Sequence, residues 1–563
     1  MGKPLLAGKQ TICAVPGVDL VANGAVGVGV RPAAQPSLQI VRQVPDEKAG
    51  VSLGSPLADV HHLVDHERRQ VRPGPGKDAR AHVHDVGEGD GRGMAECGPL
   101  EPRPCLPDEQ PLRVDAGRQF GNCRRVDPSG FERFGRREIV AHVEWSAHPA
   151  GNVAVGRLAD VDVRIVDEGD IEQVFGVLGH AFGFDPKPEH LEHFAGELEL
   201  DRLVGAFESG TLVGTGGAYS FRLTVPDGTV GCGGTTVIAV LPSPRRRGVL
   251  TAMMAFHLDE VAGRGEPVAA LWASESSIYG RFGYGVASRV VRSKADTSRL
   301  SFPRPPLGTG SVRIIDETEA RSALPPLYER IRPTRPGFLS RSESRWGAHF
   351  YDPPDWRDGG TPLRWALYEE DGDAHGYAVY RQHENWEDGV AANRLSCSSV
   401  MAATGAAEDG LWRFLAGIDL VRDLDCANTD PDSILPHIVA DSRRVQRASS
   451  DGMWVRILDV PAALTARRYQ VPGRIVLQVE DPFRESAAGT FALEGSPEGA
   501  TCRPVSDTPD LRLDVRHLSA VYLGAGRLSQ LARAGLVEGS PQALSVADLM
   551  FGWPVTPWCP EVF

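Results

Sequence analysis

The feature that most constrains the fold is a strand-like run that stops at a proline break and leads directly into three arginines, a glycine and a helical pattern. It covers residues 235–254 and reads TTVIAVLPSPRRRGVLTAMM. Its β-branched and apolar start favours a strand. From about Gly248 to Ala262, four apolar residues at helical spacing form one buried stripe: Leu250, Met254, Leu258 and Val261. The turn between strand and helix therefore predicts an anion site, because free N–H groups at a helix start favour negative charge.

The turn has two readings when taken alone. Gly248 would let the backbone approach a phosphate closely, and the arginines would add charge-assisted hydrogen bonds. A solvated basic turn has the same composition. It is not a Walker loop, because no Lys-Ser/Thr pair follows the glycine.

The elements around this turn predict an α/β layered order. Residues 161–166 alternate like a strand, and 168–182 have helical spacing. Residues 203–225 read as two strands joined at Glu208-Ser209-Gly210, a hairpin signal. A further strand is expected over 267–274, followed by a short helix through Ile278 and Tyr279.

The first 155 or so residues differ from the rest. They contain no tyrosine, and stretches such as 72–93 are glycine, proline and charge without an apolar face. We expect residues 1–158 to be a leader that is either disordered or the product of an upstream start-site assignment. Its histidines lack acidic or cysteine partners at a recognised metal spacing, so no metal site is predicted: His61, His62, His66, His82 and His84.

Composition excludes several classes of protein. The 563 residues suggest three or four domains, and the formal charge of -14 argues against general nucleic-acid binding. No run of 18 apolar residues suggests a membrane span, and no secretion signal is evident. Nine scattered cysteines read as reduced thiols. We therefore expect a cytoplasmic protein without nucleic-acid or membrane partners.

Strand, turn and helix together resemble the pyrophosphate loop of GNAT acetyltransferases, Q/R-x-x-G-x-G/A, with Arg245, Gly248 and Leu250 at its defined positions. Leu250 departs from the small residue expected there. Residues 264–285 (RGEPVAALWASESSIYGRFGYG) closely resemble the Eis (enhanced intracellular survival) family of N-acetyltransferases. Residues 451–469, residues 518–532 and the terminal Phe563 are similar to later parts of that family. The resemblance covers the chain from about residue 160 to its end.

The resemblance implies an α/β (α+β) chain of two tandem GNAT-like domains followed by a sterol-carrier-protein-like domain. We place these at residues 159–300, 301–455 and 456–563. The Pro-rich stretch 302–310 makes the first boundary credible. The second domain lacks an RRxGxx loop, so no second cofactor site is expected.

The resemblance also implies a site for acetyl-CoA as co-substrate, without metal. The main chain of Ile238, Ala239 and Val240 would pair with the pantetheine arm. Val240 N–H would donate to the thioester oxygen, an interaction of roughly 2.7 to 4 kcal/mol in other acyl-transfer sites. The pyrophosphate would be bound by Arg245, Arg246, Arg247, Gly248, Val249, Leu250 and Thr251. Ser274 and Glu275 would line the same cleft.

Tyr279 matches the general acid of the family and Phe563 its terminal carboxylate base. The phenol group of a tyrosine, whose ordinary pKa is near 10, suits proton donation at neutral pH. A terminal carboxylate is charged at that pH. Without the family resemblance, Tyr279 would be interpreted as a packed aromatic residue. Tyr284 is the alternative candidate for the general acid. The family often has an acidic residue just before the last, whereas this chain has Val562, and whether Glu561 substitutes stays open.

The family acetylates primary amines, notably on aminoglycoside-type polycations, and assembles as a hexamer. Phe182, Phe184 and Asp185 would line the acceptor side, and residues 428–433 (NTDPDS) would add carboxylates; core packing and a solvated turn are the alternatives. Two other functions stay open: acetylation of a different amine, such as a lysine or polyamine, and a non-catalytic scaffold of the same fold.

Overall fold

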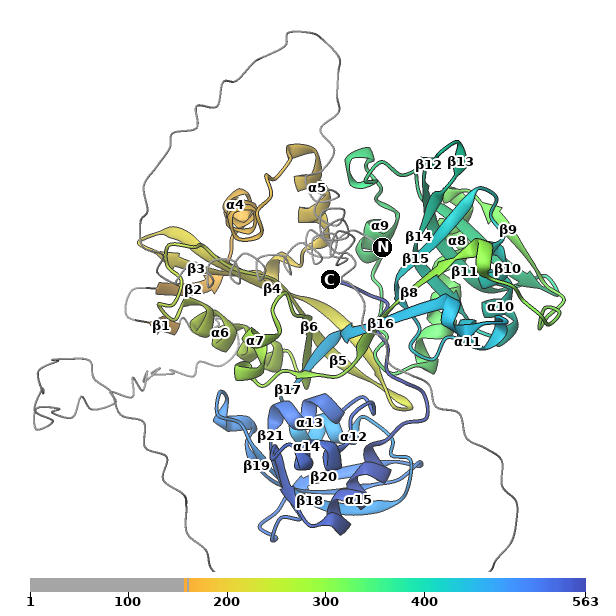
Figure 1. Cartoon of the computed structure of the whole chain (residues 1–563). Coiled ribbons are helices and arrows are strands. Elements are labelled where there is room, and N and C mark those ends of the chain that lie inside the picture. The colour runs from red at the N-terminus through yellow and green to blue at the C-terminus, as the bar shows by residue number, and fades with distance from the viewer. Residues whose placement is uncertain (1–155, 159–160) are drawn as a thin grey trace, which may run out of the picture. The chain divides into compact units, whose positions relative to one another are not determined.

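A computed structural model describes residues 156–158 and 161–563, coloured in Figure 1. Apart from residues 156–158, the predicted leader and its histidines lie outside the described residues. Within the described part, no helix is long and apolar enough to cross a membrane. The α/β architecture predicted from the sequence is confirmed by three mixed sheets with flanking helices.

The first sheet has eight strands in the described residues, in the order β1-β2-β3-β4-β5-β6-β17-β7. Neighbours are antiparallel except β5 and β6. The hairpin predicted at Glu208-Ser209-Gly210 is confirmed, with positive φ at both Ser209 and Gly210. The strands are β1 (Gly156–Leu158), β2 (Val161–Ile165), β3 (Val204–Glu208), β4 (Thr211–Val225), β5 (Gly228–Val240), β6 (Val268–Trp272), β7 (Gly285–Val286) and β17 (Met453–Ile457).

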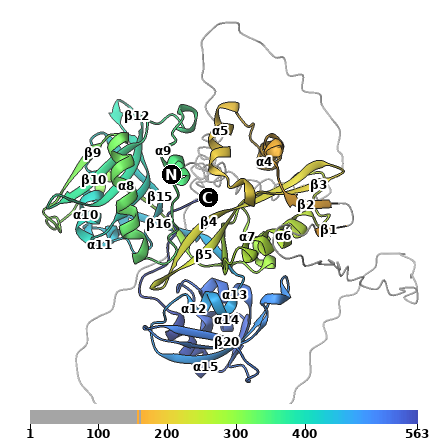
Figure 2. The same cartoon turned by 180° about the vertical axis from the view of Figure 1, so that it is seen from behind.

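Helices cover both faces of this sheet (Figures 1 and 2). Leu212 packs with α4 (Ile171–Phe182), whereas its neighbour Val213 packs with α6 (Val249–Gly263). Because successive strand residues point to opposite faces, the two helices lie on opposite sides. Two further helices belong to this part of the chain, α5 (Pro188–Glu197) and α7 (Ser276–Tyr279).

The stripe predicted on α6 is confirmed, since its four residues share one apolar cluster with Leu271. A second buried group on the same helix, formed by Val249, Met253 and Phe256, was not predicted. The helix contacts β1 to β6 and therefore lies across six neighbouring strands of the sheet. Such a broad contact buries a wider face of the helix than a single stripe, so the stripe underestimates its core.

The second sheet has seven strands in the described part, in the order β16-β8-β15-β14-β11-β10-β9. Its strands are β8 (Arg289–Asp296), β9 (Ser311–Ile315), β10 (Arg364–Glu370), β11 (Asp373–His383), β14 (Asn393–Ala402), β15 (Val421–Thr429) and β16 (Val445–Asp451). The hairpin of β12 (Trp386–Glu387) and β13 (Val390–Ala391) projects from it. The associated helices are α8 (Glu317–Ile331), α9 (Glu343–Phe350), α10 (Gly405–Ala416) and α11 (Leu435–Ile438).

The first two sheets exchange strands along the chain. β8 follows β7 of the first sheet along the chain, but it pairs with β15 and β16 of the second sheet. β17, which follows the second sheet, returns to pair with β6 and β7 (Figure 1). β8 lies before the boundary placed at residue 300 but completes the second sheet, and β17, at the boundary placed at residue 455, completes the first. The positions of these domain boundaries stay a prediction.

The third sheet has five strands among the described residues, in the order β20-β19-β18-β21-β22. Its strands are β18 (Gly473–Glu480), β19 (Gly489–Gly495), β20 (Ala500–Pro504), β21 (Leu511–Asp514) and β22 (Val537–Gly539). Its helices are α12 (Val460–Thr465), α13 (Val515–Val521), α14 (Leu528–Arg533) and α15 (Pro541–Phe551). One apolar core joins this part to β4, β5 and β17.

Candidate functional site

Two neighbouring strands of the first sheet separate where the cofactor was predicted to bind. β5 and β6 pair only from Cys232 to Gly234 on β5. Further along, β5 has a bulge at Val237, whose φ is 48°. Leu241 N–H donates to Val213 on β4 (2.9 Å), so the preceding N–H, that of Val240, points to the opposite edge. The polar groups of this edge therefore face the gap left by β6.

The predicted anion turn lies at the start of α6. Gly248 adopts a left-handed conformation (φ 88°) as the helix N-cap, and no side chain caps the helix. The N–H groups of Val249, Leu250 and Thr251 thus lack intrahelical acceptors. Arg245 and Arg246 are exposed, with φ of 66° at Arg246. The donor set fits a diphosphate: uncapped amides, a glycine and exposed guanidinium groups.

Arg247 differs from its two neighbours. Its guanidinium forms an ion pair with Glu208 at the end of β3. An anion binding at this turn would compete with that carboxylate. The three arginines are therefore not equivalent.

A narrow cleft lies beside the separated strands. It brings together Ile238, Ser274, Tyr279 and Phe563, four residues predicted from the sequence. Phe182, also proposed from the sequence, lines the same cleft, whereas Asp185 is exposed. Glu275 is exposed and immediately precedes α7, the helix that ends at Tyr279. The remaining lining residues are Thr235, Thr236, Val237, Leu271 and Trp272.

Tyr279 is 5% exposed and ends the one-turn helix α7. Burial raises the pKa of its hydroxyl above the ordinary value, and the charge of Glu275 adds to this. The phenol therefore stays protonated at neutral pH. Its ring packs edge to face against Tyr284 with centroids 6.0 Å apart. This environment suits a proton donor and not a base.

Behind the cleft lies a hydrogen-bonded trio that sequence reasoning did not find as a group. Thr235 Oγ1 lies 2.8 Å from His257 Nε2 and 2.9 Å from the Tyr284 hydroxyl. Burial, and then the charge of Arg202, lower the pKa of His257 to about 3, so the imidazole is neutral. The three residues come from β5, α6 and the segment before β7. No local spacing in the sequence links them.

The end of the chain is buried in the cleft. Phe563 is 2% exposed, and its ring packs against Phe221 with centroids 5.0 Å apart. Trp272 Nε1 donates to the Glu561 carbonyl (2.8 Å), and Arg345 Nη2 donates to the Val562 carbonyl (3.0 Å). Tyr279 and the last residue therefore line one cavity.

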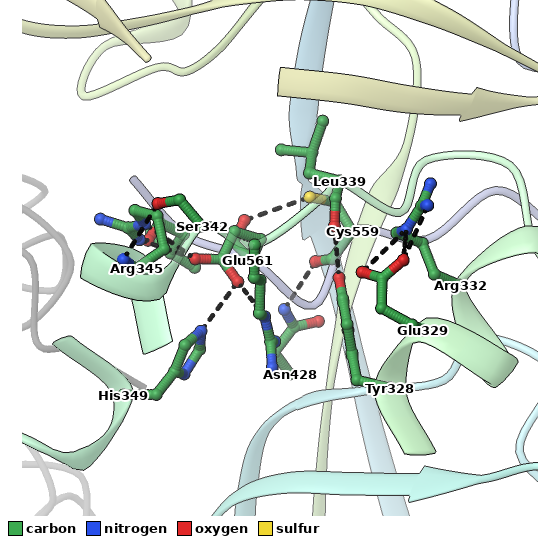
Figure 3. Close-up of polar contacts among 12 residues, drawn as sticks. Tyr328, Glu329, Arg332, Leu339, Ser342, Arg345, His349, Asn428, Cys559 and Glu561 are labelled. Atoms are coloured by element: carbon green, nitrogen blue, oxygen red, sulfur yellow. Dashed lines mark hydrogen bonds and ion pairs between the residues drawn. The ribbon is translucent and has the colours of Figure 1, made fainter. Parts of the chain in front are cut away.

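The Glu561 side chain points into a buried cluster that includes Arg345 and His349 (Figure 3). One carboxylate oxygen accepts from Arg345 Nη2 (2.7 Å), and the other accepts from Arg341 Nε (2.7 Å) and contacts His349 Nε2 (2.9 Å). Although burial opposes ionisation, His349 and the two arginines hold the pKa of Glu561 well below its usual range. Its charge is neutralised within the protein, so this carboxylate does not replace an acidic residue at position 562.

The acidic loop 428–433 also contacts the chain end. Asn428 Nδ2 donates to the Cys559 carbonyl (2.9 Å), and the Asp432 carboxylate accepts from the backbone and hydroxyl of Thr556. Asp430 pairs with Arg335 at 2.7 Å. These groups bind the C-terminal segment and Arg335, and a contact of the loop with a substrate stays a prediction.

Three family matches cover most of the described chain. Residues 162–287 match an acetyltransferase (GNAT) domain, and residues 337–457 match a second acetyltransferase (GNAT) domain family. Residues 460–560 match a sterol carrier protein domain. The order agrees with the architecture expected from the sequence.

Curated relatives include an uncharacterised N-acetyltransferase of Streptomyces avermitilis, 40% identical over 413 residues, which are 71% of this chain and 99% of the relative. The N-acetyltransferase Eis of Mycobacterium tuberculosis is 36% identical over 336 residues, 59% of this chain and 80% of the relative. Among solved structures, Eis1 of Mycobacterium abscessus superposes with a TM-score of 0.63 and 32% identity, covering 71% of this chain and all of that one. A GCN5-related N-acetyltransferase of Anabaena variabilis has the same fold at 18% identity, with a TM-score of 0.64 over 72% of this chain and all of its own.

Proposed function

The chain belongs to the Eis family of GNAT N-acetyltransferases, and on that premise we propose that it acetylates a primary amine in the cleft of the first sheet. It is an acetyltransferase, and GNAT enzymes use acetyl-CoA as co-substrate. The observation that carries the proposal is the meeting of Tyr279 and Phe563 in one cleft beside the separated strands.

The cofactor residues are proposed as follows. The pantetheine arm of acetyl-CoA pairs with the edge formed by Ile238, Ala239 and Val240. The amides of Gly248 to Thr251 and the guanidinium groups of Arg245 and Arg246 bind the diphosphate, and Arg247 joins them by leaving Glu208. Ser274 and Glu275 border the thioester end. Support comes from the uncapped helix start and the strand edge that β6 leaves unpaired.

In the proposed reaction, the terminal carboxylate of Phe563 accepts a proton from the substrate ammonium. The resulting amine attacks the thioester carbonyl carbon, whose oxygen is stabilised by the N–H of Val240. As the carbon–sulfur bond breaks, the Tyr279 hydroxyl donates a proton to the departing thiolate, and the resulting phenolate takes up the second proton that the acetylated nitrogen loses. The raised pKa of Tyr279 and the burial of Phe563 support these roles.

Aminoglycoside-type polycations are the first proposed acceptors, on the basis of the family resemblance and the anionic chain end. A second class, amines with an apolar or aromatic group, is favoured by one observation. In the described part of the chain, the cleft is lined by Phe182, Trp272 and Phe563, and no Asp or Glu side chain lines it. An acetylation assay with aminoglycosides, polyamines and arylalkylamines separates the two.

The test of the proposed function uses two variants, Tyr279→Phe and a chain extended by three residues after Phe563. We expect kcat to fall by about 100-fold or more in both, since general acid–base groups typically contribute 10²–10⁴-fold. Acetyl-CoA affinity, measured by calorimetry, should stay near the wild-type value. A kcat like that of the wild type in both variants would disprove the assigned acid and base.

Assembly as a hexamer and a cytoplasmic location are further proposals. The first rests on the family resemblance, and sedimentation equilibrium tests it. The second is supported by the intracellular source of acetyl-CoA, and fractionation of the producing cells tests it.

A further inference from the structure

The buried cluster around Glu561 lies two residues from the chain end. Glu561 is 0% exposed, and Arg341, Arg345 and His349 all contact its carboxylate. Arg341 and Arg345 lie in the segment that leads into and forms α9, so they belong to the second GNAT-like domain. The last residue, Phe563, in contrast lines the cleft of the first sheet, and Trp272 of that cleft binds the Glu561 carbonyl.

We propose that Glu561 and the Arg341–Arg345–His349 cluster form an electrostatic anchor that positions the terminal carboxylate for catalysis. This inference rests on the proposed function, in which that carboxylate is the base. It assigns a task to the second GNAT-like domain, which has no RRxGxx loop of its own. The four residues are positioning residues because none of their side chains lines the cleft.

The anchor is rigid because each cation is fixed by more than Glu561. The Arg341 guanidinium stacks over the rings of Tyr328 (3.8 Å) and Trp346 (4.6 Å). Arg345 bridges three acceptors from two parts of the chain: Glu561 and the Val562 carbonyl near the C-terminus, and Glu197 on α5. A planar guanidinium with several donors is suited to such bridging, whereas an ammonium is not.

The anchor is effective because Glu561 is only two residues from the terminal carboxylate. Two residues of extended chain span at most about 7 Å, so fixing Glu561 limits where the terminal carboxylate can lie. Trp272 binds the Glu561 carbonyl from the cleft side at 2.8 Å. The ring of Phe563 closes the other end, and a Cβ at Gly234 would come within 3.2 Å of it. The segment is thus fixed at its side chain, its backbone and its last ring.

The experiment uses the full chain with Glu561→Gln, which keeps the shape of the side chain and removes its charge. We expect kcat at pH 7 to fall by about 10- to 100-fold, as small misplacements of reacting groups do, with little change in acetyl-CoA affinity. The deficit should shrink near pH 10, because an amine that is already deprotonated needs no base. Loss of folded protein would lower the rate equally at every pH.

Asp481→Asn is the matched control. Asp481 is also a buried carboxylate, 3% exposed as a residue, and pairs with Arg456 in another part of the chain. We expect this variant to lose stability but to keep the wild-type kcat per folded molecule at every pH. Arg345→Lys is the second test variant, for the case in which Glu561→Gln does not fold, because it keeps the net charge of the cluster. Its kcat should also fall by at least 10-fold.

The outcomes separate the two proposals. If the chain extended after Phe563 loses activity while Glu561→Gln and Arg345→Lys keep wild-type kcat, the anchor is wrong and the terminal base stands. If the extended chain keeps its activity, the proposed function itself fails. A rate deficit in Glu561→Gln that is the same at pH 7 and pH 10 would also overturn the positioning role.

Discussion

At the scale of single residues, burial sets the protonation state of the groups around the chain end. Tyr279 is kept as a neutral phenol, His257 as a neutral imidazole, and Glu561 as an anion. Tyr279 and His257 are shifted by loss of hydration, whereas for Glu561 a hydrogen bond with His349 and the charges of two arginines outweigh that loss. The site therefore keeps a proton donor in the cleft, near a buried carboxylate whose charge is paired within the protein.

His349 should make stability depend on pH. Burial, and then Arg341, hold its pKa well below the ordinary value. The unfolded chain binds a proton near pH 6.5 that the folded chain refuses, so this residue lowers stability progressively as pH falls below 6.5. Between pH 7 and pH 5.5, we expect the wild type to lose about 1 kcal/mol more than His349→Gln.

Urea unfolding of both proteins at the two pH values measures this difference. The glutamine can still donate to Glu561, so the variant should fold. Other buried histidines, such as His257, contribute equally to both proteins and cancel in the comparison. An identical pH dependence in the two would refute the assignment.

At the scale of elements, the site depends on departures from regular structure. β5 bulges at Val237 and then separates from β6, and α6 starts from a left-handed glycine without a side-chain cap. In a regular sheet and a capped helix, these amides would be paired internally. The irregular elements therefore leave donors available for a ligand.

Gly248→Ala tests the start of α6. A side chain at a φ of 88° is strained by roughly 1 kcal/mol, and its relief would move the amides that we assign to the diphosphate. We expect KM for acetyl-CoA to rise about 5- to 10-fold with kcat nearly unchanged. Steady-state kinetics at saturating amine provide the measurement.

Gly265→Ala is the control at the other end of the same helix. Its φ is 76°, and an added Cβ would have no atom within 4 Å. It should lose a similar amount of stability and keep the KM of the wild type. Equal KM values in the two variants would argue against a diphosphate site at Gly248.

At the scale of the whole molecule, the described parts of the chain share strands and core. β17 completes the first sheet after the chain has formed the second, and the largest apolar cluster joins residues of the first and third sheets. The C-terminal segment then contacts the second GNAT-like domain before it reaches the first. Such cross-connections favour cooperative unfolding.

We therefore expect one calorimetric unfolding transition for residues 161–563. Val455→Ala, in the middle of β17, should cost about 2 kcal/mol and move the whole transition down by about 2–4 °C. Differential scanning calorimetry gives the result directly. Separate transitions, of which only one moves, would show that the parts unfold independently.

The sequence by itself determined the α/β class, the hairpin at Ser209-Gly210, the turn before α6 and the candidates Tyr279 and Phe563. These follow from local periodicity, turn chemistry and ordered family motifs, which are read along the chain. The exchange of β8 and β17, the trio of Thr235, His257 and Tyr284, and the pairing of Glu561 with Arg341, Arg345 and His349 were decided only by the tertiary structure. These contacts join residues up to about 220 positions apart, and burial determines which of them pair. Local spacing in the sequence indicates neither the long-range pairing nor the burial.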